Sequence, residues 1–310
     1  MFNLKTQHFK TGEELSPAEI LSLLDCAILL KEERKHNHAR DILKGKNIAL
    51  IFDKPSLRTR FSFTVAVSEL GGTTVESVSA TRKSEEPEDL ARVLSGFCHG
   101  IMIRTHDDNF IERMTKVSKV PIINGLSQFH HPCQILADLL TLKEVFKNLK
   151  GLTISYIGDG NNVLNSLLLL APSVGIHVRY VCPKEYQPNP VILESAVKKS
   201  SGGGRITKCA TPVEAVYEGN AVYTDVWTSM GFEAEKSTRE EAFAGFQVNE
   251  ELMVKAAKDA VVMHCMPMMR GKEISNTLPE RENSVIFQQS ENRLHAQKAL
   301  LVGLYSLKIQ

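Results

Sequence analysis

The sequence predicts an α/β fold made of two doubly wound parallel-sheet domains with a central cleft between them, joined by interdomain helices. Short apolar runs alternate with longer stretches of helical period along the whole chain, which is typical of parallel β-α-β units. The chain has 310 residues, of which 43% are apolar, and this length exceeds what one hydrophobic core usually serves. A leucine-rich stretch at 135–149 contains no glycine or proline, so we expect this helix to cross between the domains.

The first half of the chain contains the elements of one such domain. Ser16, Pro17 and Glu19 mark a helix start, because serine caps the N-terminus and proline is favoured in the first turn. The next elements expected in order are a buried strand at 47–52, a helix at 61–70, a strand at 74–78, a helix at 89–97, and strands at 100–103 and 120–123.

A second set of elements begins after residue 151. It comprises a strand at 152–157, a helix at 163–174, a strand at 178–182, a helix at 191–200, strands at 221–224, 260–264 and 284–287, and a helix from about 291 to 307. Because the chain forms two similar halves, the cleft between them is the expected ligand site.

Composition and charge favour a small-molecule ligand. The chain has 37 basic and 36 acidic residues, whereas a nucleic acid or an anionic membrane would need a basic surplus on one face. No run of 18 apolar residues occurs and the first ten residues carry no signal-peptide pattern, so we expect a soluble, cytoplasmic protein. The six cysteines lack C-x-x-C pairs and zinc-ligand spacing, which predicts reduced thiols, no disulfide and no metal.

Polar groups follow the predicted strands of the first half, where open α/β sheets bind ligands. Residues 56–60 (SLRTR) combine hydroxyls, helix-start N–H groups and two arginines, which suits a phosphate; a capped helix with solvated arginines is the alternative. Arg104 directly follows another apolar strand. In residues 131–134 (HPCQ), His131 would donate to a carbonyl and Gln134 would bind an amide, although a packed histidine is the alternative.

Polar residues also follow three predicted strands of the second half. Residues 158–162 (GDGNN) open a helix, but Val163 stands where a dinucleotide fingerprint needs its third glycine. Residues 225–231 (DVWTSMG) offer a carboxylate, a hydroxyl and a turn glycine, which suit an amino group. Residues 264–267 (HCMP) put a thiol at the mouth of the predicted cleft, where a buried, inert cysteine is the alternative.

Taken together, these motifs resemble the transcarbamylases. The S-x-R-T-R and H-P-x-Q elements are similar to those of both aspartate and ornithine carbamoyltransferases, whereas D-x-x-x-S-M-G and H-C-x-P are similar to those of the ornithine enzymes; residues 291–293 (ENR) complete the match. The resemblance implies transfer of the carbamoyl group of carbamoyl phosphate to the δ-amine of L-ornithine, giving L-citrulline and phosphate without metal or cofactor. There are two alternatives: the enzyme transfers the carbamoyl group to putrescine or a substituted ornithine, or the protein is a non-catalytic ligand-binding paralogue.

The resemblance also implies a role for each matching residue. The catalytic residues would be Arg58, Arg104, His131, Asp225 and Cys265, of which Asp225 and Cys265 would orient and deprotonate the amine. Carbamoyl phosphate would be bound by Ser56, Leu57, Arg58, Thr59, Arg104, His131, Gln134, Cys265, Met266 and Arg293. Ornithine would be bound by Asn162, Asp225, Ser229 and Met230.

The same resemblance implies how the chain is divided and assembled. A carbamoyl-phosphate-binding domain would cover 1–133, an ornithine-binding domain would cover 134–290, and a C-terminal helix at about 291–310 would return to the first domain. The enzyme would be a homotrimer with its sites near the subunit interfaces.

One loop departs from the family pattern. Ala80 stands at or near the place of a glutamine that the family contributes to the active site of a neighbouring subunit, and the segment is shorter than the family pattern. Arg82 or Lys83 would reach bound carbamoyl phosphate across the subunit boundary instead, and a solvated loop neutralised by the acidic residues that follow is the favoured alternative.

Overall fold

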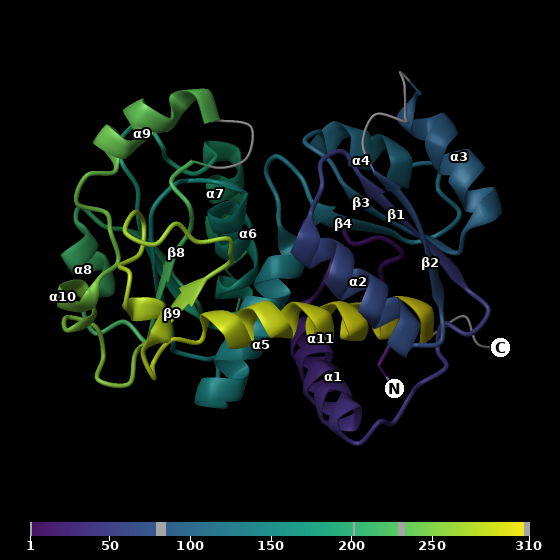
Figure 1. Cartoon of the computed structure of the whole chain (residues 1–310), viewed down its shortest axis with the longest axis horizontal. Helices are drawn as coiled ribbons and strands as arrows, with labels where there is room; N and C mark the ends of the chain where they lie inside the picture. Colours follow the sequence, from purple (N-terminus) through teal and green to yellow (C-terminus); the bar gives the residue numbers. More distant parts are fainter. Residues whose placement is uncertain (1, 79–84, 201, 229–232, 307–310) are drawn as a thin grey trace. The chain divides into compact units, whose positions relative to one another are not determined.

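The chain divides into two compact α/β units (Figure 1). The computed structural model describes residues 2–78, 85–200, 202–228 and 233–306. Unit 1 contains Met1–Leu140 and Glu291–Gln310, and unit 2 contains Thr141–Ser290. The strands of both sheets pair in parallel. The predicted fold class, with two parallel-sheet α/β domains, is therefore confirmed.

Unit 1 is built on a four-stranded sheet in the order β2-β1-β3-β4. Its strands are β1 Asn47–Phe52, β2 Thr73–Val78, β3 Gly100–Arg104 and β4 Ile122–Leu126. Its helices are α1 Pro17–Lys35, α2 Leu57–Glu69, α3 Pro87–Phe97, α4 Asp108–Thr115, the first part of α5 Pro132–Phe146 and most of α11 Ile286–Tyr305. The strand order reverses between β1 and β3, and ligands bind at such switch points.

The first helix begins where the sequence predicts it. Ser16 accepts the backbone N–H of Glu19 at 3.3 Å, and the Glu19 carboxylate accepts the backbone N–H of Ser16 at 2.9 Å, which completes a capping box. The buried face of α1 consists of Ile20, Leu23, Leu24, Ala27 and Leu30.

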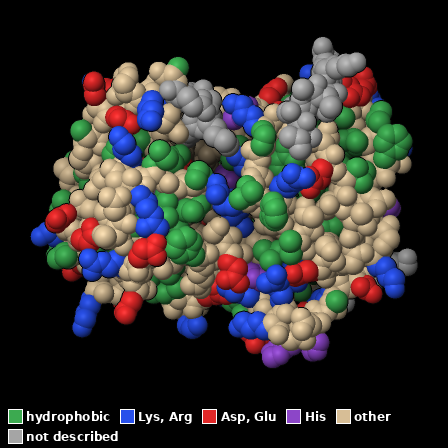
Figure 2. All heavy atoms as spheres, viewed as in Figure 1, with side chains coloured by type: hydrophobic (Ala, Val, Ile, Leu, Met, Phe, Trp, Pro, Cys, Tyr) green, Lys and Arg blue, Asp and Glu red, His purple; other side chains and the backbone are tan. Residues whose placement is uncertain are grey.

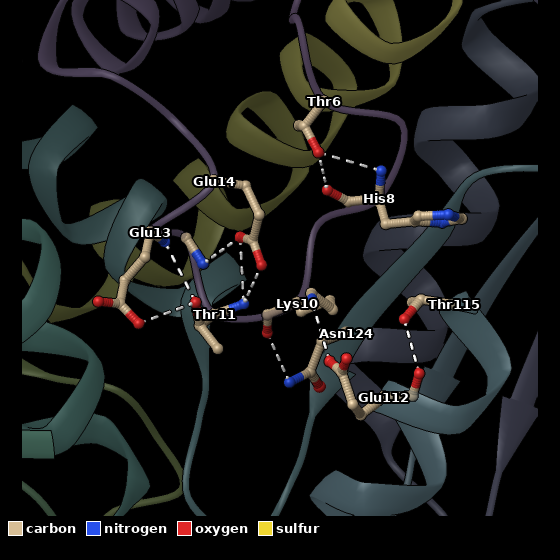
Figure 3. A network of polar contacts seen from close by, with 10 residues as sticks. Thr6, His8, Lys10, Thr11, Glu13, Glu14, Glu112, Thr115 and Asn124 are labelled. Atoms are coloured by element: carbon tan, nitrogen blue, oxygen red, sulfur yellow. Dashed lines mark hydrogen bonds and ion pairs between the residues drawn. The ribbon is translucent and has the colours of Figure 1, made fainter. Parts of the chain in front are cut away.

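The N-terminal segment extends the sheet of unit 1 beyond β4. Phe9 pairs in parallel with Ile123 and forms two backbone hydrogen bonds of 2.8 Å with β4. Side chains secure this pairing (Figure 3): the Asn124 Nδ2 group donates to the Lys10 carbonyl at 2.8 Å, and Lys10 Nζ pairs with Glu112 of α4 at 2.8 Å. The segment thus covers part of a strand edge that would otherwise be open to pairing with another chain.

Unit 2 is built on a five-stranded sheet in the order β7-β6-β5-β8-β9. Its strands are β5 Thr153–Ile157, β6 His177–Val181, β7 Ile206–Lys208, β8 Ala221–Thr224 and β9 Val261–His264. Its helices are α6 Asn162–Leu170, α7 Pro190–Lys198, α8 Pro212–Val216, α9 Lys236–Ala242 and α10 Glu250–Met253, with 3₁₀ helices at Pro172–Val174, Glu233–Glu235 and Leu278–Glu280. Here the strand order reverses between β5 and β8.

The structure corrects one predicted strand and adds one that was not predicted. The predicted strand at 284–287 is wrong: Ser284 forms a single bridge with Val262, and α11 begins at Ile286. A run of three apolar residues, here 285–287, cannot by its period distinguish a strand from the first turn of a helix. The added strand, β7, has only three residues and lies at the sheet edge, so it lacks the apolar run that marks a buried strand.

Two helices of unit 1 also differ from the prediction. Helix α2 begins at Leu57, four residues before its predicted start, because Ser56 adopts an extended N-cap conformation. Arg58 and Thr59 therefore lie in the first helical turn, whose backbone N–H groups have no acceptor within the helix. Helix α4 was not predicted, although Asp107 caps it by accepting the Phe110 N–H at 3.2 Å.

The surface carries mixed charge. Figure 2 shows basic and acidic side chains interspersed over both units on the face drawn, in keeping with the formal net charge of +1. Among the helices that the structure describes, none has the length and hydropathy needed to span a membrane. All six cysteines carry free thiols.

Candidate active site

Arginine and hydroxyl side chains gather at the switch point of the unit 1 sheet. Arg104, the last residue of β3, donates from Nη1 to Ser56 Oγ at 2.9 Å and to Thr59 Oγ1 at 3.2 Å. Arg293 of α11 donates from Nη2 to the same Thr59 oxygen at 2.7 Å. The two arginines are 8% and 3% exposed. The fold thus brings together four residues from three distant parts of the sequence.

The two hydroxyls of this cluster are arranged to donate to an anion. Because Thr59 Oγ1 accepts hydrogen bonds from both arginines, its own hydrogen remains for a further acceptor. Ser56 occupies the N-cap of α2, yet its side chain does not cap the helix and accepts from Arg104 instead. Hydroxyls, guanidinium groups and the N–H groups of the first turn of α2 together suit a phosphate.

The first turn of α2 also holds an uncommitted arginine. The Arg58 side chain is half-buried and makes no hydrogen bond or ion pair with the residues that the structure describes. By contrast, Arg60 Nε pairs with Glu76 at 2.6 Å. The Leu57 side chain is 70% exposed, so its contribution to an anion site would come from its backbone N–H.

His131 and Gln134 lie at the start of α5. Burial lowers the pKa of His131 well below 6.5, and the charges of Arg293 and Arg104 lower it further, so the ring is neutral near pH 7 and can donate one N–H. Gln134 is fully buried, and its Nε2 donates to Asp138 at 2.8 Å. Its Oε1 has no hydrogen-bond partner among the described residues. A buried acceptor left in this way suits an N–H donor such as a carbamoyl amide.

A carboxylate and a thiol meet at the carboxyl ends of β8 and β9 in unit 2. Cys265 Sγ donates to Asp225 Oδ1 at 2.9 Å, and both side chains are buried. The same oxygen accepts the Val226 N–H at 2.8 Å. The other oxygen, Oδ2, accepts the side-chain amide of Asn161 at 2.6 Å. Asp225 is therefore held on both of its oxygens.

A buried histidine–glutamate pair supports the segment that carries the thiol. His264 Nδ1 accepts the Met266 N–H at 2.9 Å, which assigns the ring proton to Nε2, and Nε2 lies 3.1 Å from Glu273 Oε1. Both residues are fully buried. Met266 has a left-handed backbone with φ of 62°, which its hydrogen bond to His264 helps to hold.

Three polar atoms of this region, from Asp225, His264 and Cys265, lie within 4.8 Å of one another. The thiol donates to the carboxylate, and the two ring nitrogens of His264 are engaged by Met266 and Glu273. The carboxylate and the thiol are thus joined to each other, whereas the histidine is held by separate partners. The thiol–carboxylate pair is the part of this group that suits holding a proton.

A buried ion pair fixes the backbone that follows Asp225. Arg239 of α9 donates from Nη1 to Asp159 Oδ2 and to the Trp227 carbonyl, both at 2.9 Å. Its guanidinium also lies 4.4 Å from the centre of the Tyr186 ring. Burial raises the pKa of Asp159 to about 6, and the Arg239 charge opposes this shift.

We expect Arg239→Met to destabilise the protein more at pH 7.5 than at pH 5. The folded-state pKa of Asp159 lies above its ordinary value, so the contribution of this group to stability falls as pH rises from about 4 to about 6. Without Arg239 that pKa rises further, and at pH 7.5 an uncompensated buried carboxylate costs about 3–5 kcal/mol. Urea unfolding at the two pH values measures the difference; an equal loss at both would contradict it.

Comparison with known proteins agrees with the motifs. The family model for the carbamoyl-P binding domain of aspartate/ornithine carbamoyltransferase matches residues 7–144, and the model for the Asp/Orn binding domain matches residues 150–304. This chain belongs to the aspartate/ornithine carbamoyltransferase family. The resemblance seen in the sequence is therefore confirmed.

Relatives named ornithine carbamoyltransferase match this chain over nearly its whole length. The Archaeoglobus fulgidus protein is 44% identical over 302 residues, which cover 96% of this chain and 97% of the relative. The structure of the Pyrococcus furiosus ornithine carbamoyltransferase superposes with a TM-score of 0.94 at 39% identity, covering 99% of each chain. An N-acetyl-L-ornithine transcarbamylase structure has a TM-score of 0.86 at 28% identity, covering 96% of this chain and 100% of that one.

The structure accounts for the remaining predicted residues of the family site as follows. Asn162 is the first residue of α6 and is half-buried. Ser229 and Met230, expected to contact ornithine, lie outside the described residues. The same holds for Ala80, Arg82 and Lys83 of the departing loop.

Sequence reasoning missed several polar residues that contact the predicted ones. Asn161 and Asp159 belong to the GDGNN segment, of which only Asn162 was predicted to contact a ligand. His264 belongs to the HCMP motif, and its position beside Cys265 was the available signal. No local pattern pointed to Glu273 or Arg239.

Proposed function

We propose that this chain transfers the carbamoyl group of carbamoyl phosphate to the δ-amine of L-ornithine, giving L-citrulline and phosphate. The proposal rests on one observation: this chain contains both a cluster of side chains suited to a phosphate and a pair of side chains suited to an amine. Unit 1 has a buried arginine cluster suited to a phosphate, and unit 2 has a thiol–carboxylate pair suited to an amine. We assign carbamoyl phosphate to residues 1–133 with 291–310, and ornithine to residues 134–290.

Carbamoyl phosphate binding follows from the donors of unit 1. The phosphate would lie on the first turn of α2, held by Ser56, Leu57, Arg58, Thr59, Arg104 and Arg293. The neutral ring of His131 would donate to the carbamoyl oxygen, and Gln134 Oε1 would accept from the carbamoyl NH₂ group. Arg104 and Arg293 are already held by hydrogen bonds before the reaction, so their donors are placed to stabilise the negative charge that develops on the carbonyl oxygen.

Ornithine must lose a proton from its δ-ammonium group before it can attack. Three hydrogen bonds, from Asn161, Val226 and Cys265, occupy Asp225, and a carboxylate has about four acceptor positions, so one remains for the ammonium group. Asp225 would accept the proton with Cys265 beside it, while Asn162, Ser229 and Met230 bind the amino-acid end. Met266 would contribute its carbonyl oxygen.

The amine nitrogen then forms a bond to the carbonyl carbon, and the bond from that carbon to the phosphate oxygen breaks. The second proton of the attacking nitrogen passes to the leaving phosphate, which departs as HPO₄²⁻. The leaving phosphate carries its charge onto the arginine cluster that bound it, so the same donors serve both the oxyanion and the leaving group.

We also propose a cytoplasmic homotrimer that acts in arginine metabolism. Consecutive elements of unit 1 carry exposed apolar side chains, which favour a contact with another subunit. Phe61 of α2 is 61% exposed, Val75 of β2 54% and Phe97 of α3 72%. The free thiols suit a reducing compartment. The suggestion that Arg82 or Lys83 serves a neighbouring site stays a prediction.

The test is an assay of phosphate release from carbamoyl phosphate with ornithine, putrescine, aspartate and N-acetylornithine as acceptors, with citrulline identified as the product formed from ornithine. We expect ornithine to exceed every other acceptor in kcat/KM by at least about a hundredfold, because a site with buried polar groups for an α-amino acid leaves them unpaired with other amines. Comparable turnover of another acceptor would contradict the proposal. Absence of turnover with all four would favour a ligand-binding protein.

A further inference from the structure

The side-chain amide of Asn161 is used at both of its ends. Its Oδ1 accepts the backbone N–H groups of Val163 and Leu164 at 3.0 and 3.2 Å, which caps α6. Its Nδ2 donates to Asp225 Oδ2 at 2.6 Å. Because two backbone donors face Oδ1, the orientation of the amide is settled and the NH₂ group must face the carboxylate.

The elements on either side of this contact are fixed. Asn161 follows β5 and Asp225 follows β8, and these strands are neighbours, with Ile157 opposite Thr224. All residues of α6 from Val163 to Leu170 are buried, so the helix that Asn161 caps is anchored in the core. The Tyr156 hydroxyl donates to the Asp159 carbonyl at 3.0 Å and lies 3.3 Å from Asn161 Oδ1, which further restricts the turn.

We infer that Asn161 is a positioning residue for the reaction: through its amide, the N-terminus of α6 sets the orientation of the Asp225 carboxylate. The inference rests on the proposed function, in which Asp225 accepts the proton of the amine. Asn161 acts through Asp225, whereas Asn162, the next residue, is the one assigned to the substrate.

The cap alone does not require an asparagine. Capping uses only the side-chain oxygen, and aspartate or serine caps a helix about as well. The NH₂ group is what an asparagine adds, and here it donates to the one oxygen of Asp225 that neither Cys265 nor Val226 contacts. Loss of this donor would leave that oxygen free to turn away from the amine.

The substitution Asn161→Asp distinguishes the capping of α6 from the orientation of Asp225. Aspartate keeps the cap but replaces the donor with a second carboxylate facing Asp225. We expect the melting temperature at pH 7 to fall, because the new carboxylate faces the buried carboxylate of Asp225. We expect kcat/KM for ornithine to fall by about thirtyfold or more, mostly in kcat. The acid limb of the pH profile should move to higher pH, because two neighbouring carboxylates share a proton. The KM for carbamoyl phosphate should stay within about twofold.

A matched control is available in the same unit. Asn189 caps α7 by accepting the N–H groups of Val191 and Ile192 at 3.0 and 3.3 Å. Asn189→Asp makes the same chemical change at a cap whose side chain makes no hydrogen bond with Asp225 among the described residues, and we expect it to leave both the kinetics and the pH profile unchanged.

A second variant covers the case in which Asn161→Asp folds poorly. Asn161→Ser keeps a capping oxygen and adds no charge, and we expect a loss of about tenfold in kcat/KM without a shift of the pH profile. If whichever of the two variants folds keeps kcat/KM within about threefold of the parent protein with an unchanged profile, Asn161 is only a cap and the inference is overturned. Absence of citrulline from the parent protein would instead overturn the proposed function, and this inference with it.

Discussion

Replacing Asp225 with asparagine is expected to lower kcat/KM for ornithine by about a thousandfold, within the range that a positioned general base contributes. Asparagine has nearly the same shape and can keep one oxygen toward Val226 and Cys265. Its NH₂ group, however, would then face the NH₂ group of Asn161, where the carboxylate now accepts a hydrogen bond of 2.6 Å. The variant therefore loses both the proton acceptor and the fixed orientation of the side chain.

The pH dependence of Asp225→Asn identifies the cause of the loss. Ornithine loses its δ-proton to solvent more readily at high pH, so a variant that lacks only the base should regain part of its rate between pH 7 and pH 9. Asp259→Asn is the matched control, because Asp259 is an exposed carboxylate of the same unit. A kcat/KM within about tenfold of the parent value at pH 7 would remove Asp225 from the role of base.

Most of the fold could be predicted because its strands are short apolar runs that are followed directly by polar residues. The strand at 221–224 is found at the predicted bounds, and β1 likewise. The errors fall where the apolar pattern is weak or ambiguous. The edge strand β7 has two exposed residues out of three, and the run at 284–287 supplies the first turn of a helix.

The anion-binding group of unit 1 could be predicted in part from composition alone. Arginines and hydroxyls directly after two strands suggested a phosphate, and the sheet order places those two strands, β1 and β3, side by side. What composition could not supply is the arrangement of the hydrogen bonds. Thr59 accepts hydrogen bonds from both Arg104 and Arg293, and the second of these follows only from the return of α11 to unit 1. Within the part of the chain that the structure describes, the Arg58 side chain makes no hydrogen bond or ion pair.

The supporting residues of unit 2 were beyond sequence reasoning for a related reason. The contact of Asn161 with Asp225 depends on β5 and β8 being neighbours, and the Arg239–Asp159 pair depends on where α9 packs. A local pattern marks a strand end or a helix cap, but it does not tell which other strand end lies beside it. Pairings across a sheet need the strand order, which the apolar pattern leaves open.

Arg58→Leu is expected to lower kcat/KM by about a hundredfold or more while the protein stays folded. The Arg58 side chain has no hydrogen bond or ion pair with the described residues, so its removal breaks no internal contact and should change the free energy of unfolding by less than about 0.5 kcal/mol. The loss should appear in the KM for carbamoyl phosphate and in kcat, because the guanidinium would bind the phosphate and the developing oxyanion.

The control for this variant lies two residues along the same helix. Arg60 has the same side chain but is committed to Glu76 at 2.6 Å and is more than half exposed, so Arg60→Leu removes an ion pair worth less than about 1 kcal/mol. We expect its kcat/KM to stay within about threefold of the parent value, since it leaves the donors of the first turn intact. Equal losses from Arg58→Leu and Arg60→Leu would mean that general positive charge, rather than one directed guanidinium, binds the phosphate. Unchanged kinetics for Arg58→Leu would remove this residue from the site and leave the anion to Arg104 and Arg293.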